Sequence, residues 1–598
     1  MKNLDEKNSP YLSIFVGIFT LAFILGCGSS YTTTRPVLDQ KTLLKPDSGI
    51  VVARIINASS YPLPFNNLTI TPENLNTSKK IKPNELRALQ PLRKDTSIFA
   101  SSVPIGNYSL NNINAWYIRG EYRYSFFVQA STKIGTFEVK AGHVTDLGTL
   151  VYYPKPQTDS YLKLILRVPE SANGEVLKNY FPFYQYEPSK ILSWKDDGLL
   201  EERESVFASV AQNPIIYNKT YLAPDGTLYF LSKLGIILTR TPHGEWIVDG
   251  VDTNFNLNAI AKSNNGDLIV GGAEGKLFVK PVGGEWKDIS IEFGKEILEL
   301  KFSSDSTIDM ITNEKSKAVI YRTDLETLNW QELNAFSYSG GWKNFQSATT
   351  NGSNKASNGG NRSNKGKAYR IFAVNTHKLE DKHLIEVSTV RASHSGVFAN
   401  TSEKTFSYNP ETWEVRPSDS TSDVDIVIQS GSVKIGIERA GYWDWDGLPE
   451  YFRYDATSNQ WVEFKSQVYF CPGDEIISNK FCPNSDGKGK KIKAKRRQFR
   501  FNSLPQFSSE LDAVALVSFA KFGYSDKNKE RQIKLLKTSD GGQTWSDTGN
   551  ELPLDYCGSF VREVTDRLLL SCEGASTDFY ESFDNGANWE HVRQHDNF

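Results

Sequence analysis

The sequence predicts an all-β chain of 598 residues, in which a small N-terminal β-sandwich precedes a β-propeller. A turn motif recurs near the C-terminus: Thr538–Trp545 and Ser582–Trp589 both read Ser/Thr-x-Asp-x-Gly-x-Thr/Asn-Trp and lie 44 positions apart. A weaker Gly and Trp frame at residues 225–246 recurs 40 positions later, at residues 265–286. Aromatic residues make up 12% of the chain, which suits half-buried strand faces. A period of about 40 residues with one aromatic side chain per unit is typical of propellers.

The motif has a local physical purpose. A tight hairpin turn needs glycine where φ is positive, the Asp carboxylate accepts N–H groups of its own turn, and the Trp ring buries apolar area beneath it. We therefore assign structural roles, and no catalytic role, to six residues: Asp540, Gly542, Trp545, Asp584, Gly586 and Trp589.

These motifs resemble the Asp-box (BNR repeat) propellers, a group that includes sialidases, sortilin-type receptors and photosystem II assembly-factor-like proteins. The resemblance covers residues 205–598, with two well-matched boxes. It implies a fold and leaves the activity open, because this fold hosts many functions.

Spacing of the hairpin-closing tryptophans gives the number of blades. The accepted positions are Trp246, Trp286, Trp330, Trp413, Trp461, Trp545 and Trp589. Two steps are nearly double, and each contains an insertion: residues 347–367, a low-complexity stretch predicted to be a disordered loop, and residues 464–497, which are basic. We predict seven blades, with eight as the alternative. The chain ends nine residues after Trp589, so we expect a strand near Ser205–Ile216 to complete the last blade.

The N-terminus has the proportions of a signal peptide. An apolar run from Tyr11 to Leu25 follows two lysines and ends in Ile24–Cys27, which resembles a bacterial lipobox. That resemblance implies that residues 1–26 are removed and that Cys27 is lipidated. The other readings are a buried helix or an uncleaved membrane anchor. Gly28 and Ser29 follow, with no Asp at the second position, which implies the outer membrane if the cell is Gram-negative.

Four cysteines remain besides Cys27, as expected in an oxidising compartment. Three pairings are open to them, and proximity favours Cys471–Cys482 and Cys557–Cys572. Zinc binding is the rival reading, but no C-x-x-C pair supports it.

The domain layout follows from composition. Residues 27–46 form a polar tether, and residues 47–155 form an antiparallel β-sandwich of alternating strands. Residues 156–204 form a connector, with helical spacing that begins near Leu199, and residues 205–598 form the propeller.

Few residues suggest chemistry. The formal net charge of −2 argues against a nucleic-acid partner. Tyr369–Phe372 approaches the Phe/Tyr-Arg-Ile-Pro motif of sialidases but ends in Phe and lies mid-propeller. The seven histidines show no metal-ligand spacing. We therefore predict no catalytic residue, no metal and no cofactor.

Two clusters are candidates for binding. Trp443 and Trp445 flank an Asp-Gly turn, where they form either core packing or a stacking surface for sugar or peptide. The run Lys488–Arg497 has seven basic residues in ten and includes Lys491, Lys493, Arg496 and Arg497. It is either a solvated, exposed loop or a contact for an anionic surface.

Together these features predict a membrane-anchored, exported lipoprotein of the cell envelope that acts as a binding or assembly module, with a protein or glycan ligand. The alternative is a sialidase-like glycoside hydrolase.

Overall fold

The computed structural model describes residues 32–34, 46–59, 65–73, 82–89, 96–119, 122–157, 160–169, 171–181, 187–214, 217–314, 317–338, 345–347, 370–379, 381–392, 399–417, 424–438, 450–472, 476–478, 480–485, 491–519, 533–554, 557–572 and 578–593. Cys27, the predicted signal peptide, Trp443 and Trp445 lie outside these ranges, as do nearly all of the tether and of the low-complexity stretch. No helix in the described ranges is long and apolar enough to cross a membrane.

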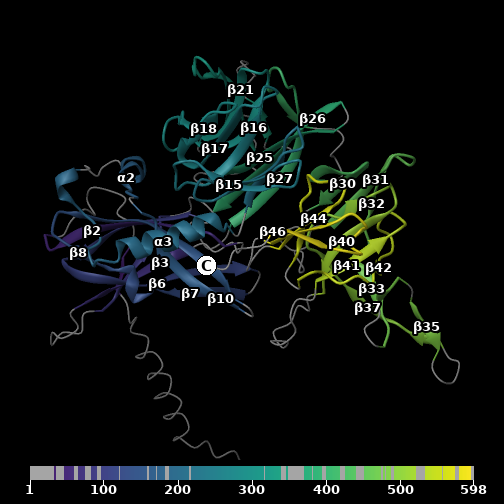
Figure 1. The fold of residues 1–598 in the computed structure, drawn as a ribbon, viewed down its shortest axis with the longest axis horizontal. Helices are drawn as coiled ribbons and strands as arrows, with labels where there is room; N and C mark the ends of the chain where they lie inside the picture. Colours follow the sequence, from purple (N-terminus) through teal and green to yellow (C-terminus); the bar gives the residue numbers. More distant parts are fainter. Residues whose placement is uncertain are drawn as a thin grey trace, which may run out of the picture.

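Two sheets packed face to face form the N-terminal unit (Figure 1). The first contains β1 (Thr32–Thr34), β4 (Asn84–Arg87), β3 (Phe65–Pro72), β6 (Gly106–Arg119), β7 (Tyr122–Gln129) and β8 (Thr136–Val139). The second contains β10 (Ser160–Arg167), β9 (Val144–Gln157), β2 (Ser48–Asn57), β5 (Thr96–Pro104) and β11 (Ile191–Leu192). Alternate apolar residues of both sheets share one core, including Val51, Leu68 and Tyr152.

We expected a purely antiparallel N-terminal unit, but its sheets contain both parallel and antiparallel strand pairs. β2 pairs with β9 in parallel, and the chain between them crosses to the opposite sheet twice, with β5 between the two crossings. β1 with β4 and β11 with β9 are also parallel pairs. β10, from the segment predicted as a connector, pairs with β9 over its whole length. That segment also contains α2 (Gly174–Tyr180) and the start of α3 (Leu200–Gln212), which continues into the range predicted as propeller.

Beyond residue 216, the described chain forms seven successive antiparallel sheets of four or five strands, here named sheets 1 to 7. Sheet 1 contains β12 (Tyr217–Leu222), β13 (Leu228–Ser232), β14 (Ile236–Arg240) and β15 (Trp246–Gly250); sheet 2 contains β16 (Leu257–Lys262), β17 (Leu268–Gly272), β18 (Leu277–Lys280) and β19 (Lys287–Asp288); sheet 3 contains β20 (Glu296–Phe302), β21 (Thr307–Glu314), β22 (Lys317–Asp324), β23 (Gln331–Tyr338) and β24 (Phe345–Ser347).

The remaining sheets continue the same pattern. Sheet 4 contains β25 (Arg370–Leu379), β26 (Lys382–Ala392), β27 (Ala399–Tyr408) and β28 (Val415–Pro417); sheet 5 contains β29 (Ile426–Ser430), β30 (Val433–Glu438), β31 (Glu450–Asp455) and β32 (Gln460–Glu463); sheet 6 contains β38 (Arg500–Phe501), β39 (Gln506–Phe507), β40 (Ala513–Ser518), β41 (Ile533–Thr538) and β42 (Ser546–Asp547); sheet 7 contains β43 (Ser559–Phe560), β44 (Leu568–Cys572), β45 (Asp578–Ser582) and β46 (Glu590–Arg593).

These sheets close into a ring, which makes the fold a β-propeller. Each sheet shares a buried apolar cluster with the next one along the chain. Sheet 7 in turn shares a cluster with sheet 1, in which Val561, Leu569 and Phe579 pack on Phe230 and Leu238.

The prediction that a strand near Ser205–Ile216 completes the last blade is therefore wrong. Residues 205–212 belong to α3, and sheet 7 has four strands of its own. The ring closes by packing of side chains and not by exchange of a strand.

The N-terminal unit is docked on the ring through a buried arginine. Arg54 of β2 donates from Nε to the Thr149 hydroxyl (3.1 Å) and from Nη2 to the Asn254 carbonyl (3.2 Å), and its guanidinium lies 4.0 Å from the centre of the Phe255 ring. Apolar side chains of β2, β9 and α3 pack beside it against Leu234 and other side chains of sheet 1. A buried charge that is held by hydrogen bonds and an aromatic face fixes the two units relative to each other.

Both predicted disulfides are present, Cys471–Cys482 and Cys557–Cys572. The second closes a loop that includes the β43–β44 pair of sheet 7 and lies within the apolar cluster between sheets 6 and 7.

From Lys491 onward, the basic run forms strands and not the exposed loop that we expected; residues 488–490 lie outside the described ranges. Between β32 and β38, the strands β33 (Gln467–Phe470), β34 (Ile476–Ile477) and β37 (Lys495–Gln498) make one small sheet, and β35 (Phe481–Ser485) and β36 (Lys491–Lys493) make another. Ile492 and Ala494 turn inward to the Cys471–Cys482 disulfide, and the alternating residues Lys491, Lys493 and Lys495 are exposed. This alternation is what a strand needs.

The two turn motifs hold themselves together. The Asp540 carboxylate accepts hydrogen bonds from the N–H groups of Gln543 (3.0 Å) and Thr544 (2.8 Å) and from the hydroxyl of Thr544 (2.6 Å). The Asp584 carboxylate accepts two comparable hydrogen bonds from Asn588, one from its backbone N–H (2.9 Å) and one from its side-chain amide (2.7 Å). The backbone bond from Asn588, followed by its side-chain bond, lowers the pKa of Asp584 to about 2.

The tryptophans of the two motifs differ in burial, and we predict that their removal differs in cost. Trp545 is 1% exposed and lies among Phe499 and Phe501, whereas Trp589 is only partly buried. Trp545→Ala should lower the free energy of unfolding by about 3–5 kcal/mol, as for other large buried rings, and Trp589→Ala by clearly less. Urea unfolding of both variants measures this. Equal losses would show that burial in the folded chain does not set the cost.

Candidate functional site

Charged side chains from the first strands of several sheets meet near the axis of the ring. Lys219 of β12 places Nζ 2.9 Å from Glu299 Oε2 of β20 and 2.8 Å from Asn375 Oδ1 of β25. These strands open sheets 1, 3 and 4, so the side chains reach across the ring and not only to a neighbouring sheet. The side chains of Lys219 and Glu299 are 19% and 9% exposed.

β-Bulges in the first strands orient the side chains of Lys219 and Glu299 toward the axis. The register of β12 shifts between Tyr217 and Lys219, and that of β20 shifts between Ile297 and Glu299. The first strand of sheet 4 has a shift of the same kind just before Ala373. A bulge inserts one extra residue and turns the following side chain out of the regular alternation. The same local device therefore directs polar groups toward the axis from several sheets.

Hydrogen bonds hold the Glu299 carboxylate. Its Oε1 accepts from the Thr376 N–H at 3.2 Å and from the Thr376 hydroxyl at 2.8 Å, while Oε2 faces Lys219. A buried carboxylate with an opposite charge and two further donors is fully compensated. Glu299 and Lys219 are thus held in place by each other and by Thr376 and Asn375.

A second pair of side chains beside them has fewer of its hydrogen-bonding atoms paired. His377 Nδ1 of β25 lies 3.8 Å from Glu386 Oε1 of β26, and within the described part of the chain His377 Nε2 and Glu386 Oε1 are buried without a hydrogen-bond partner. Burial, and then the positive charge of Arg562, lowers the pKa of His377 to about 4. Burial raises the pKa of Glu386, although Arg562 acts against that rise. Arg562 comes from sheet 7, so a fourth sheet contributes to this axial cluster.

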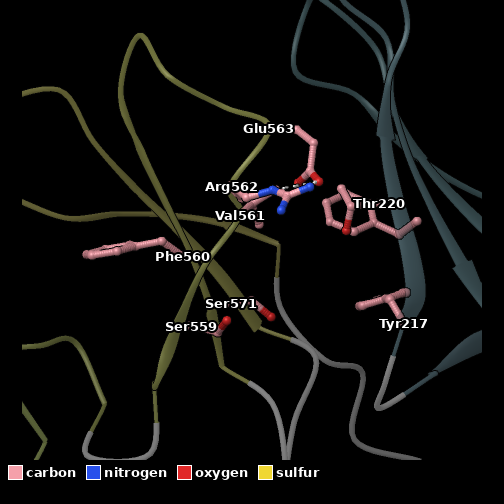
Figure 2. A pocket seen from close by; sticks show the side chains of 9 residues that line it. Tyr217, Thr220, Ser559, Phe560, Val561, Arg562, Glu563 and Ser571 are labelled. Atoms are coloured by element: carbon pink, nitrogen blue, oxygen red, sulfur yellow. Dashed lines mark ion pairs between the residues drawn. The ribbon is translucent and has the colours of Figure 1, made fainter. Parts of the chain in front are cut away.

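A pocket of about 200 Å³ opens at the seam between sheets 7 and 1. Figure 2 shows Tyr217 and Thr220 of β12 on one side and the loop after β43 on the other. From that loop, the Glu563 carboxylate approaches the Arg562 guanidinium, with Nε 3.8 Å from Oε1. The pocket therefore offers both charges, hydroxyl groups and an aromatic wall within a small volume.

The residues named from the sequence are distributed differently. The turn motifs lie in sheets 6 and 7, and the basic residues of β36 and β37 lie in the insertion, so neither group lines the pocket. Arg370 lies in β25, while Tyr369 is outside the described residues. No group of three or more His, Cys, Asp or Glu side chains in the described ranges is arranged to hold a metal ion.

Sequence reasoning missed the axial cluster. His377 is one of the seven histidines without metal-ligand spacing, and Lys219, Glu299, Glu386 and Arg562 belong to no motif. A usable signal did exist at Glu299, a charged residue that stands between Leu298 and Leu300 in the first strand of sheet 3.

No family model matches the chain, and no curated protein matches it. Among solved structures, it is similar to one described as YCF48 bound to D1 peptide, with 13% identity, a TM-score of 0.32, and coverage of 61% of this chain and 90% of that one. It is also similar to the Dos1 propeller, with 12% identity, a TM-score of 0.32, and coverage of 62% and 93%. BamB from Moraxella catarrhalis gives 9% identity, a TM-score of 0.27, and coverage of 60% and 94%. At these scores the likeness bears on neither partner nor activity.

The low pKa of His377 predicts a pH dependence of stability. The folded chain protonates His377 near pH 4 and the unfolded chain near 6.5, so its contribution is full above about pH 6.5 and is lost as the pH falls toward 4. The raised pKa of Glu386 acts in the opposite sense, so the wild type must be compared with His377→Gln. Between pH 7 and 5 the free energy of unfolding of the wild type should fall by about 1–2 kcal/mol more than that of the variant. Parallel curves in urea titrations at the two pH values would contradict this.

Proposed function

We propose that this chain is an exported lipoprotein, anchored by Cys27 in the cell envelope, whose propeller is a binding or assembly module for a protein ligand. On this proposal sheets 1 to 7 are seven blades of the Asp-box type, and the N-terminal unit is an accessory β-sandwich. The two disulfides support an oxidising compartment. In a Gram-negative cell the residues after Cys27 direct the protein to the outer membrane.

The seam pocket is the observation that carries the binding role. At about 200 Å³ it is smaller than typical cavities for whole small molecules or cofactors, which begin near 300 Å³. It has room for one or two side chains of a peptide segment. Arg562 and Glu563 at its edge can pair with either charge of such a segment, and Phe230 gives an apolar wall. These features favour a protein ligand over a glycan.

The hydrolase alternative gains less support. The sialidase resemblance requires a cluster of arginines around a carboxylate together with a Tyr/Glu nucleophile pair. Around Glu386 and His377, the acting cations are Arg562 and Lys219, and Lys219 is already engaged by Glu299. Hydrolysis of a sialoside by the purified protein would nevertheless favour that alternative at once.

Site-directed photocrosslinking tests the binding role. A benzophenone amino acid in place of Thr220, at the pocket, should give a discrete protein adduct in cells. The same group in place of Ile247, which is 49% exposed on the last strand of sheet 1, is the matched control and should give none. Arg562→Glu should abolish the Thr220 adduct. Adducts of equal yield at both positions, or insensitivity to Arg562→Glu, would contradict a binding role for the seam.

Lipidation at Cys27 gives a separate prediction. Wild-type protein should incorporate labelled fatty acid and remain in the membrane fraction, and Cys27→Ser should lose the label and leave that fraction. Cys557→Ser is the control, because it removes a thiol that is already in a disulfide. Absence of label from the wild type, or its persistence in Cys27→Ser, would refute the assignment.

A further inference from the structure

The insertion between sheets 5 and 6 forms a braced arm. Its two small sheets, β33–β34–β37 and β35–β36, are joined by the Cys471–Cys482 disulfide, because Cys471 follows β33 and Cys482 lies in β35. Ala494 and parts of Tyr469 and Ile492 complete a small core around the sulfur atoms. In Figure 1, β35 lies at the outer end of this arm, beyond β33 and β37. The arm is thus a folded projection: Val468 and Ile476 at its base pack on sheet 6, and the disulfide braces its outer part.

Positive charge is concentrated on this arm. Residues 467–498 include eight Lys and Arg and three Asp and Glu, although the whole chain has a net charge of −2. Lys491, Lys493, Lys495 and Arg496 are exposed, and none of them forms an ion pair with any described residue. Arg497 differs, since its guanidinium lies 4.6 Å from the centre of the Phe470 ring and supports the fold of the arm.

An aromatic side chain is exposed among these charges. Phe481 of β35 is 52% exposed and pairs in register with Lys493, and Lys491 Nζ lies 5.9 Å from the centre of its ring. A single exposed ring needs no partner by itself. Here, however, the ring lies among four exposed cations that form no ion pair with a described residue, and this combination suits a partner that is both anionic and apolar. The interface of a bilayer has this combination, because phosphate groups overlie acyl chains.

We propose that this arm binds the surface of an anionic phospholipid bilayer. The four free cations contact headgroup phosphates, and Phe481 enters the boundary between headgroups and acyl chains. The charges are spread along β36 and β37 and are not gathered around a cavity, which fits an extended charged plane better than a small anion or one side chain. The contact is separate from the seam pocket and from lipidation at Cys27, so it stands if either of those assignments fails.

Vesicle binding of the chain from residue 28 onward tests this proposal. All proteins lack residues 1–27, so neither the apolar run Tyr11–Leu25 nor an acyl chain on Cys27 contributes. Vesicles of phosphatidylethanolamine with phosphatidylglycerol are compared with vesicles of phosphatidylcholine alone. The arm variant is Lys491→Gln, Lys493→Gln, Lys495→Gln and Arg496→Gln, and Arg497 is left intact. The matched control removes four exposed lysines elsewhere: Lys178→Gln, Lys287→Gln, Lys317→Gln and Lys382→Gln.

The arm variant should bind the anionic vesicles at least about tenfold more weakly than the parent, since each surface cation adds to attraction by anionic lipid. The control should change binding by less than about twofold. Phe481→Ser should weaken binding by about threefold, and added salt should weaken binding of the parent. Lys491→Arg with Lys493→Arg and Lys495→Arg should bind like the parent, which separates charge from loss of fold.

Three results would overturn the proposal: equal binding by the arm variant and the parent, equal binding of the parent to both kinds of vesicle, or weak binding by the arginine variant. A fourth result would also overturn the proposal: the parent binds polyglutamate and not vesicles, and the arm variant no longer binds polyglutamate. The surface would then be assigned to an acidic protein. Mapping of Cys471–Cys482 in each variant verifies that the arm is folded.

Discussion

The contact between the first and last sheets is the constraint on which the ring depends. At its centre, Glu581 of β45 accepts hydrogen bonds from Arg240 of β14 (Nη2 to Oε2, 2.7 Å) and from Arg567 (Nε to Oε1, 2.6 Å). Burial opposes ionisation of Glu581, but these two arginines outweigh it and hold its pKa below the usual range. The ring of Phe579 packs beside this group at 5.1 Å from Phe230. Loss of one partner of a buried pair commonly costs about 3–5 kcal/mol, because the other charge is left buried without compensation.

Closure of the ring creates both parts of the candidate site. The pocket exists only because β12 meets the loop that carries Arg562, although more than half of the chain separates them in sequence. The axial cluster likewise needs Lys219 and Glu299 to face each other across the ring. The docked N-terminal unit, with Arg54 buried against residues that follow sheet 1, steadies the same side of the propeller. A binding role follows naturally from groups held in place before any ligand arrives.

Local chemistry could be predicted from the sequence, and long-range closure could not. The turn motifs and both disulfides depend on residues close in sequence, so the sequence pattern alone predicts them. The site depends on bulges and on contacts between distant sheets, for which residues such as Lys219 carry no local signature. The basic run was predicted to be a loop because its charge density hid a period of two: Ile492 and Ala494 alternate with lysines, as strand residues do. The closing strand was wrong because apolar packing, and not backbone pairing, joins sheet 7 to sheet 1.

A double-mutant cycle between Phe230 and Phe579 tests this closure most directly. The two residues lie far apart in sequence and belong to the first and last sheets, so they can couple only if the ring is closed. Unfolding free energies of Phe230→Leu, Phe579→Leu and the double variant are measured in urea. A closed ring predicts a coupling energy of about 0.5–1.5 kcal/mol, as for packed aromatic pairs. Losses that add within about 0.3 kcal/mol would show that the two sheets do not pack on each other and would contradict the account.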